Sequence, residues 1–323
     1  MGSLFDLALG NILTPAVLFF ALGVVSALAR SELSIPEAIA KTLALYLMMA
    51  IGFKGGVEVA KSGLTFNLLS VLATGILLSA CLPVLGFWLL RTTTKLDAAN
   101  AAAIAAHYGS ISIVTFIAAT QTLQSLGVQF EGYMIAVAAV METPAIIIAL
   151  ILAARSGSKT RTQSGLWREV TLNASVVTLL GSFLIGWASG EAGAAQVKPF
   201  FVDIFRGVLC LFLLDMGLVA GRGLRNSFRL LAFPVLAFGI YMPLVSACCA
   251  AVLCLVLGLS PGGAALLITL AASASYIAVP AAMRLALPDA QPSIYLTLSL
   301  AVTFPFNLTV GIPLYLWLAE RVT

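Results

Sequence analysis

The sequence has very few charged residues: Asp, Glu, Lys and Arg make up 9% of its 323 residues, against 61% hydrophobic ones. A soluble domain carries roughly 25% charged residues, so this chain cannot cover a globule with polar surface, and a soluble enzyme is excluded. A disordered chain is excluded too, because disorder needs low hydrophobicity. The net charge of +4 is small and dispersed, which gives no reason to expect a nucleic-acid partner.

Histidine and cysteine are also scarce. The one histidine, His107, has no other ligands clustered near it, so the sequence predicts no metal site beyond a possible sodium ion. An intramembrane enzyme would need paired aspartates, a His-Glu zinc motif or a serine–histidine dyad, and the sequence has no such spacing. We therefore expect no enzymatic function. The cysteines all lie inside apolar runs and are expected to fill the core; they are Cys81, Cys210, Cys248, Cys249 and Cys254.

Long apolar runs dominate the sequence instead. At roughly 20 residues per crossing, ten of them are long enough to span a bilayer. Their hydrophobicity is continuous rather than alternating, which predicts helices and not a β-barrel. The predicted spans are residues 12–29, 35–53, 66–90, 98–122, 132–153, 171–189, 200–220, 230–257, 262–287 and 294–318.

Lysine and arginine are unevenly divided between the predicted loops. Eleven lie after the odd-numbered spans and at most five on the opposite side. Because basic loops face the cytoplasm, both termini are predicted on the outer, periplasmic side of the cell inner membrane. Residues 155–170 are basic and rich in serine and threonine, and they predict a cytoplasmic linker between two five-span units, residues 1–154 and 171–323.

The two halves share short matches in the same order along the chain. The matched pairs are Gly52 with Gly217, Gly56 with Gly221, Ser110 with Ser273, Ser112 with Ser275, and Pro144 with Pro305. Five spans on each side of the linker place the halves in opposite orientation, a recurrent plan of secondary transporters. We predict an all-α integral membrane fold of ten transmembrane helices in two inverted five-helix repeats, with helices 4 and 9 broken.

Spans 4 and 9 contain the residues least suited to lipid, including Gly109 in span 4 and Pro280 in span 9. Paired interruptions at membrane depth are the best sequence pointer to a transporter's substrate site. Helix N-termini and serine hydroxyls there favour a small anion, and exposed carbonyls favour a cation such as sodium. The expected substrate-binding residues are Gly109, Ser110, Ile111, Ser112, Ser273, Ala274, Ser275 and Tyr276. The alternative is that these small residues only let helices pack closely.

Four residues are candidates for binding a coupling ion: Glu142, Asp215, Thr115 and Thr303. Carboxyls at membrane depth are costly and often mark ion or proton paths. Solvation at the interface is the alternative for Glu142, and a structural ion pair with a neighbour such as Lys41 is the alternative for Asp215. His107 is expected to pack or hydrogen-bond rather than relay protons.

The order of these motifs resembles the SbtA-type sodium-dependent bicarbonate permeases. The resemblance rests on residues 35–39, 51–56, 109–112, 141–145, 205–207, 216–217, 271–275 and 311–314. It implies a core domain that moves against a gate domain, a homotrimer, and bicarbonate held between crossed broken helices with sodium as the coupling ion. A small PII-like cytoplasmic regulator is known in the family. The chain departs from the family at Tyr276 and Ala50, where members often carry Asp and Lys.

We therefore predict a secondary active transporter in the lipid bilayer that takes up a small anion, most simply bicarbonate with sodium, by an elevator-type mechanism. The alternative that the residues leave open is a proton- or sodium-coupled carrier of another small carboxylate or inorganic anion.

Overall fold

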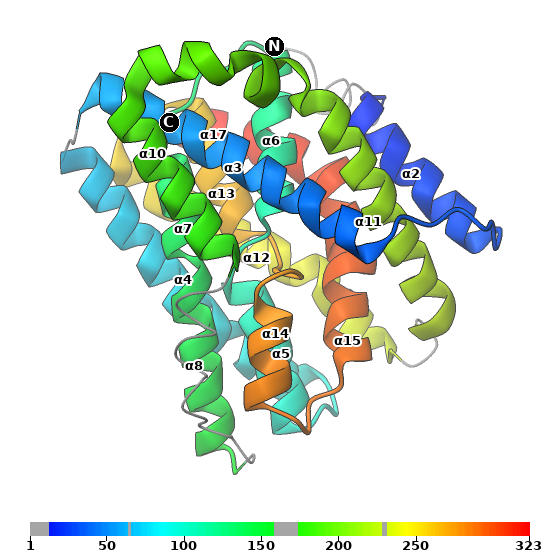
Figure 1. Cartoon of the computed structure of the whole chain (residues 1–323). Coiled ribbons are helices and arrows are strands. Elements are labelled where there is room, and N and C mark those ends of the chain that lie inside the picture. The colour runs from blue at the N-terminus through cyan, green and yellow to red at the C-terminus, as the bar shows by residue number, and fades with distance from the viewer. Residues whose placement is uncertain (1–12, 64–65, 158–173, 228–230) are drawn as a thin grey trace.

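The computed structural model describes residues 13–63, 66–157, 174–227 and 231–323, and every regular element in these ranges is a helix (Figure 1). Seven helical segments in this part of the chain are long and apolar enough to cross a membrane. They are Glu37–Lys61, Phe66–Thr93, Ala98–Ser125, Met134–Arg155, Phe205–Arg225, Phe233–Leu257 and Pro292–Val322. This supports an all-helical, multi-pass membrane protein, whereas the number of ten spans stays a prediction.

The remaining predicted spans fall on shorter or interrupted helices. α2 has 14 residues, and α10 has 25 residues but kinks at Gly190, whose φ of 57° is left-handed. The predicted ninth span is divided between α13 and α14. The helices are α2 (Pro15–Leu28), α3 (Glu37–Ser62), α4 (Phe66–Thr93), α5 (Ala98–Gly109), α6 (Ile113–Ser125), α7 (Met134–Val140), α8 (Glu142–Arg155), α10 (Ala174–Lys198), η1 (Pro199–Asp203), α11 (Phe205–Ser227), α12 (Phe233–Leu257), α13 (Pro261–Ala271), α14 (Val279–Ala286), α15 (Pro292–Leu296), η3 (Thr297–Thr303), α16 (Phe304–Phe306), η4 (Asn307–Gly311) and α17 (Ile312–Val322).

Polar side chains fix where the buried helices begin. The Asp97 carboxylate accepts a hydrogen bond from the Asn100 backbone amide at 2.8 Å and starts α5. Ser260 does the same for α13, and its own amide donates to Glu131 at 2.8 Å. Such caps satisfy amides that have no partner within the helix, which matters most where lipid or protein replaces water.

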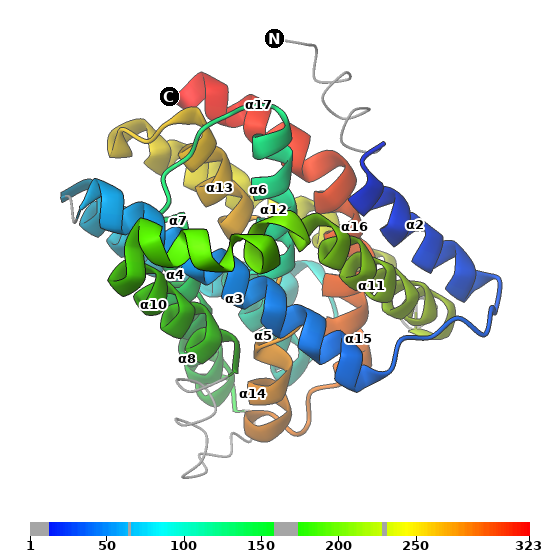
Figure 2. The ribbon, with the colours of Figure 1, turned by 45° about the horizontal axis from the view of Figure 1, so that its top comes forward.

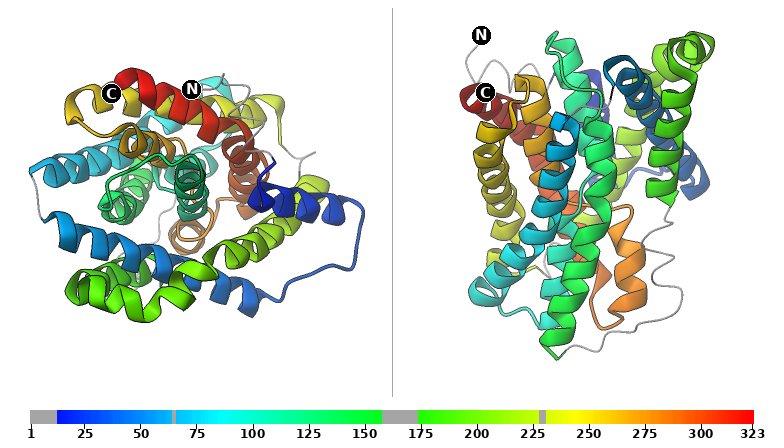
Figure 3. Two further views of the ribbon diagram at one scale, coloured as in Figure 1. Left: turned by 90° about the horizontal axis from the view of Figure 1, so that it is seen from above. Right: turned by 90° about the vertical axis from the view of Figure 1, so that its left-hand side faces the viewer.

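The helices fall into two groups. α2, α3, α10, η1 and α11 lie along one side of the molecule and are here called the scaffold group (Figure 3). The other described helices, here called the core group, surround α5, α6, α13 and α14. Every described residue of α6 from Ile113 to Thr120 is buried, as is α13 from Gly262 to Ala271. The broken spans therefore lie inside the core group.

Glycines bring the scaffold helices into close contact. α3 lies against α10, and α2 lies against α11 (Figures 1 and 2). A Cβ at Gly56 would meet the Phe183 carbonyl oxygen at 1.9 Å, and one at Gly217 would meet the Phe20 carbonyl oxygen at 2.1 Å. Gly52 and Gly23 are equally confined. Both pairs therefore depend on glycine for backbone contact, the small-residue packing that joins helices in membranes.

We expect the Gly186→Ala variant to be destabilised and the Gly181→Ala variant to fold normally. Both glycines lie in α10, but a Cβ at Gly186 would stand 2.0 Å from the Phe53 carbonyl oxygen, whereas nothing lies within 4 Å of one at Gly181. Forcing two backbones apart costs about 1–3 kcal/mol. Thermal unfolding in detergent checks this, and equal melting temperatures for the two variants would show that α3 and α10 do not pack this closely.

Two further spans are less regular than the sequence suggests. The predicted fifth span is interrupted at Met141, where α7 ends and α8 begins, and the predicted tenth span contains the π-helical segments η3 and η4. π-helical turns are uncommon and are often found at functional sites.

The expectation that all cysteines fill the core is wrong: only Cys254 is buried, and Cys81 and Cys248 are exposed on the apolar surface.

Candidate functional site

The first break interrupts the predicted fourth span. α5 ends at Gly109 and α6 begins at Ile113, with the backbone extended at Ser110 and Ser112. All residues of the break are buried. A Cβ at Gly109 would lie 2.1 Å from the Pro83 Cγ atom of α4, so only glycine allows α5 to end this close to α4.

The second break interrupts the predicted ninth span. α13 ends at Ala271 and α14 begins at Val279, so the unwound segment is longer than the first one. Pro280 lies in the first turn of α14, where its missing amide hydrogen leaves no helical carbonyl without a partner. It therefore starts the second half-helix, and the interruption predicted from its position is confirmed.

Hydrogen bonds join the two breaks directly. The Ser275 backbone amide donates to the His107 carbonyl oxygen at 2.8 Å. The Ser112 amide donates to the Ser273 Oγ atom at 2.8 Å, and that hydroxyl donates to the Leu270 carbonyl oxygen at 2.8 Å. Segments 161 residues apart thus complete each other's backbone hydrogen bonding, which is how irregular backbone is tolerated inside a membrane protein.

The serine hydroxyls of the breaks differ in how far they are already engaged. Ser112 caps α6, accepting from the Thr115 amide at 3.2 Å and from the Thr115 hydroxyl at 2.9 Å. The Ser110 hydroxyl donates to the Glu142 carbonyl oxygen at 3.3 Å. Ser275 is buried, and its hydroxyl makes no hydrogen bond with the described residues. Of these serines, Ser275 is therefore the one whose hydroxyl has no partner among the described residues and is free for a ligand.

A buried tyrosine hydroxyl is also unsatisfied at this place. Tyr276, the last of the predicted substrate-binding residues, is buried, and its hydroxyl lies close to Ser112 without a hydrogen bond of acceptable geometry. Its ring packs edge-on against Phe304, which fixes its orientation. An unpaired buried donor is costly, so its position beside the N-terminus of α6 suits a ligand that supplies the missing acceptor.

Three of the four candidate coupling-ion residues lie in the core group. Glu142 is buried at the start of α8, has no ion pair with a described residue, and is tied to the first break through its carbonyl oxygen. Thr115 contacts Ser112 in the first turn of α6. The Thr303 hydroxyl donates to the Gly239 carbonyl oxygen at 2.6 Å and contacts the Tyr108 hydroxyl, so it joins α12 to η3.

Asp215 lies in the scaffold group instead. It is buried in α11, and the described interactions do not connect it with either break. The alternative that it pairs with Lys41 is wrong, because Lys41 pairs with Glu37 at 2.7 Å and both side chains are largely exposed. A charge that does act on Asp215 is that of Arg222, two helical turns along α11.

The structure adds residues that the sequence analysis did not single out. The Asn307 amide donates to the Ala272 carbonyl oxygen of the second break at 2.9 Å, and its Oδ1 atom accepts from the Tyr315 hydroxyl at 2.6 Å. Ser79 of α4 donates to the Met141 carbonyl oxygen at 2.5 Å, where α7 meets α8. An amide and a hydroxyl inside long apolar runs were the only signals in the sequence.

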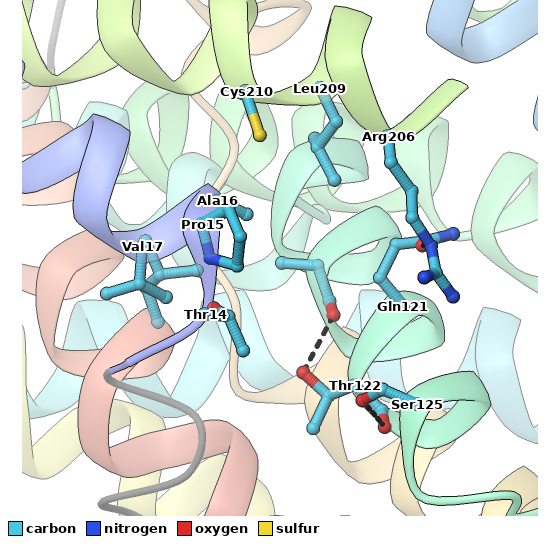
Figure 4. A pocket seen from close by; sticks show the side chains of 12 residues that line it. Thr14, Pro15, Ala16, Val17, Gln121, Thr122, Ser125, Arg206, Leu209 and Cys210 are labelled. Atoms are coloured by element: carbon cyan, nitrogen blue, oxygen red, sulfur yellow. Dashed lines mark hydrogen bonds between the residues drawn. The ribbon is translucent and has the colours of Figure 1, made fainter. Parts of the chain in front are cut away.

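A separate cavity of about 170 Å³ lies between α2, α6 and α11 (Figure 4). Arg206 of α11 borders it and donates to the Gln121 Oε1 atom of α6 at 3.2 Å. This bond joins the scaffold group to the core group. No residue of either break lines the cavity, which is apart from the joined breaks.

Among the described residues, no group of three or more His, Cys, Asp or Glu side chains is placed to hold a metal ion. The His107 ring is buried and stacks on Tyr295 with ring centroids 4.5 Å apart. Its Nδ1 atom lies 2.6 Å from the Ala103 carbonyl oxygen, whereas its buried Nε2 atom has no hydrogen-bond partner among the described residues.

The chain matches the family model described as the Na+-dependent bicarbonate transporter superfamily over residues 15–320. This match covers nearly the whole sequence, and the chain belongs to this family. The resemblance noted from the motifs is therefore confirmed. Since this is a family of transporters, membership favours transport over catalysis. No curated protein matches the chain by sequence.

Proposed function

We propose that the protein is a secondary active transporter that takes up bicarbonate together with sodium. The observation that carries this proposal is the direct joining of two broken helices by the Ser112–Ser273 and Ser275–His107 hydrogen bonds. Broken helices that meet inside a bundle provide the backbone dipoles and carbonyls with which transporters bind ions. Membership of the Na+-dependent bicarbonate transporter superfamily supports the choice of ions.

The substrate would be held by the breaks without a basic side chain. No Lys or Arg lies in residues 109–112 or 271–276, so the negative charge would be met by the N-terminal ends of α6 and α14, by hydroxyl donors and by a bound cation. Ser275 and Tyr276 supply donors that make no hydrogen bond with the described residues. Gly109, Ser110, Ile111, Ser112, Ser273 and Ala274 would shape the rest of the site.

The coupling cation would bind beside the anion. Glu142 is a buried carboxyl with no ion pair among the described residues, and its backbone is bonded to the first break. Thr115 and Thr303 offer hydroxyl oxygens in the same core group, and sodium prefers such oxygen ligands as other hard cations do. Anion and cation side by side would each lower the cost of burying the other, which couples their movements.

The same buried carboxyl favours a second candidate, a proton-coupled carrier of a small carboxylate or inorganic anion. Glu142 would then bind and release the coupling proton as it alternates between the two sides, and Asp215, also buried, is the second candidate for this role. The identity of the coupling ion distinguishes the two proposals.

Transport would follow an elevator-type mechanism built on two inverted five-helix repeats, residues 1–154 and 171–323, joined by a cytoplasmic linker. In the inverted repeats, α3 corresponds to α11 and α10 corresponds to α2, so the α3–α10 pair has its counterpart in the α11–α2 pair. Both pairs pack through glycines at matching positions. The core group carries the breaks and would move past the scaffold group. The Arg206–Gln121 hydrogen bond spans the two groups and would break during this shift.

We further propose a homotrimer in the cell inner membrane, with both termini on the periplasmic side. The scaffold helix α10 presents exposed apolar side chains at Leu184, Ile185 and Trp187, which suit contact with a second copy as well as with lipid. A PII-like cytoplasmic regulator would act on the linker side, and most of residues 155–170 lie outside the described part of the chain.

Uptake into proteoliposomes tests this function. Labelled bicarbonate should accumulate when sodium is imposed outside, at fixed pH and membrane potential, and should not accumulate when potassium replaces sodium. Accumulation that does not depend on sodium but requires an inward proton gradient would show proton coupling, with Glu142 and Asp215 as the candidate proton-binding residues. No uptake under either gradient, from protein shown to be folded and correctly inserted, would contradict bicarbonate transport.

The Ser275→Ala variant should transport bicarbonate with a severalfold higher KM and an unchanged melting temperature. The Ser275 hydroxyl makes no hydrogen bond with the described residues, so its removal takes a donor from the ligand and none from the fold. A neutral hydrogen bond contributes about 0.5–1.5 kcal/mol, which sets the scale of the loss. Ser293→Ala, at an exposed serine of α15, is the control, and an unchanged KM in Ser275→Ala would remove this hydroxyl from the site.

A further inference from the structure

Three arginines surround an open hollow of about 630 Å³ at the end of α2, away from the joined breaks. The hollow is lined by Ala27, Arg30 and Ser31 from the end of α2 and by Arg222 and Arg225 from α11. No carboxylate is among these lining residues. Three guanidinium groups around one hollow repel each other, and although Arg222 also interacts with the Asp215 carboxyl of α11, an anion between the three would relieve the repulsion.

Two of the arginines are held in place by the protein. Arg222 donates to the Leu33 carbonyl oxygen at 3.2 Å, and Arg225 donates to the Ala27 carbonyl oxygen at 3.1 Å. The Arg222 bond uses one of the five N–H groups of its guanidinium, so donors remain there for a ligand. Because the side chains are oriented beforehand, less entropy is lost when they bind a group with several acceptor oxygens.

The third arginine is in an unfavourable backbone conformation. Arg30 has a φ of 60°, and it is the one residue other than glycine with positive φ among those described. A non-glycine residue in this left-handed region costs about 1–2 kcal/mol, and glycine would avoid the cost. Backbone strain of this kind tends to occur where a side chain has a function, and here it brings Arg30 to the same hollow as Arg222 and Arg225.

We propose that this arginine cluster binds the phosphoryl group of an anionic lipid. Arginine matches phosphate oxygens through paired hydrogen bonds, and the positive charge of the cluster attracts the negative phosphoryl group. A lipid is favoured over free phosphate because exposed apolar side chains adjoin the cluster on the same two helices. These are Val25 and Leu28 on α2 and Val219 on α11, where an acyl chain can lie. The bound headgroup would fasten the turn after α2 to α11 and so stabilise the scaffold group.

Lipid binding to the purified protein in a neutral detergent tests the site. Native mass spectrometry would give the dissociation constants of phosphatidylglycerol and of zwitterionic phosphatidylcholine, and inorganic phosphate would be titrated separately. We expect phosphatidylglycerol to bind preferentially. Arg222→Gln should weaken its binding about tenfold or more, the scale of a charge-assisted hydrogen bond. Arg91→Gln is the matched control, because Arg91 also donates to a backbone carbonyl, that of Leu96 at 2.7 Å, but lines no part of the hollow.

The Arg30→Gly variant separates binding from folding. It removes a guanidinium but also relieves the backbone strain, so it should bind phosphatidylglycerol about tenfold more weakly while its melting temperature without lipid stays the same or rises. Phosphate binding with the same dependence on Arg30 and Arg222 would support the phosphoryl site with a free anion as its ligand. Equal binding of the two lipids, or equal losses in Arg222→Gln and Arg91→Gln, would overturn the proposal.

Discussion

Replacing Ser273 with alanine should lower the kcat/KM of sodium-driven bicarbonate uptake by about 5- to 150-fold. The Ser273 hydroxyl accepts a hydrogen bond from the Ser112 amide in the first break. It donates to the Leu270 carbonyl oxygen at the end of its own helix, α13. Alanine would leave the buried Ser112 amide without a partner, which costs about 1–3 kcal/mol. The two breaks would then no longer be held in register. The loss should exceed that of Ser275→Ala, which removes a donor but breaks no bond between the helices.

The matched control for Ser273→Ala is Thr269→Val on the same helix. Thr269 is buried one turn earlier in α13, and its hydroxyl donates to the Ala265 carbonyl oxygen at 2.7 Å, which is already part of the helix. Valine has nearly the same side-chain shape as threonine and leaves no backbone amide unpaired, so the kcat/KM of uptake should change by less than about threefold. Equal losses in the two variants would mean that any buried hydroxyl in α13 matters and that the contact between the breaks has no special role.

The Gly109→Ala variant should lose almost all uptake. A Cβ at this position would lie 2.1 Å from the Cγ atom and 2.4 Å from the Cδ atom of Pro83, whose ring cannot turn away. It would also reach the Ala145 Cβ atom at 3.0 Å. Overpacking of this kind typically costs about 1–3 kcal/mol, and here the strain would move the end of α5 and with it the first break. Uptake and melting temperature should both fall.

Two further variants show whether the loss in Gly109→Ala comes from the clash with Pro83. Gly86→Ala, on α4, is the control, because the nearest atoms to its Cβ are 3.5 Å away in the Met242 and Phe238 side chains. Its stability should be unchanged or about 1 kcal/mol higher, since alanine is the better helix former. Pro83→Ala should restore part of the activity of Gly109→Ala by removing the clashing ring. Full activity in Gly109→Ala alone would contradict the contact between α4 and the break.

The helices and the breaks follow from the sequence because each depends on local chemistry. Continuous apolar runs must form helices in a bilayer, where every backbone group needs an internal partner. Gly109 and Pro280 mark interruptions for the same reason, since one weakens a helix and the other fits only its first turn. The glycine matches between Gly52 and Gly217 likewise point to real packing sites, because close backbone contact tolerates no larger side chain.

The partners of the polar residues could not be predicted, because they come from segments far apart in the chain. Asn307 bonds to Ala272, and the Ser112 amide bonds to Ser273, contacts that only the tertiary structure brings together. The alternative of a Lys41–Asp215 pair fails for a related reason. Lys41 finds Glu37 one turn away on its own helix, where an exposed pair costs no desolvation. Sequence alone also cannot tell which apolar residues face lipid, as the exposed cysteines show.

Titration calorimetry of bicarbonate binding shows whether the joined breaks bind an anion and a sodium ion together. Purified protein would be titrated with bicarbonate in sodium buffer and in potassium buffer at the same pH and ionic strength. Binding in sodium should be at least about tenfold tighter than in potassium, since the coupling free energy between two sites is typically about 1–3 kcal/mol. The Ser273→Ala variant should lose this difference. Equal affinity in the two buffers would contradict a shared site.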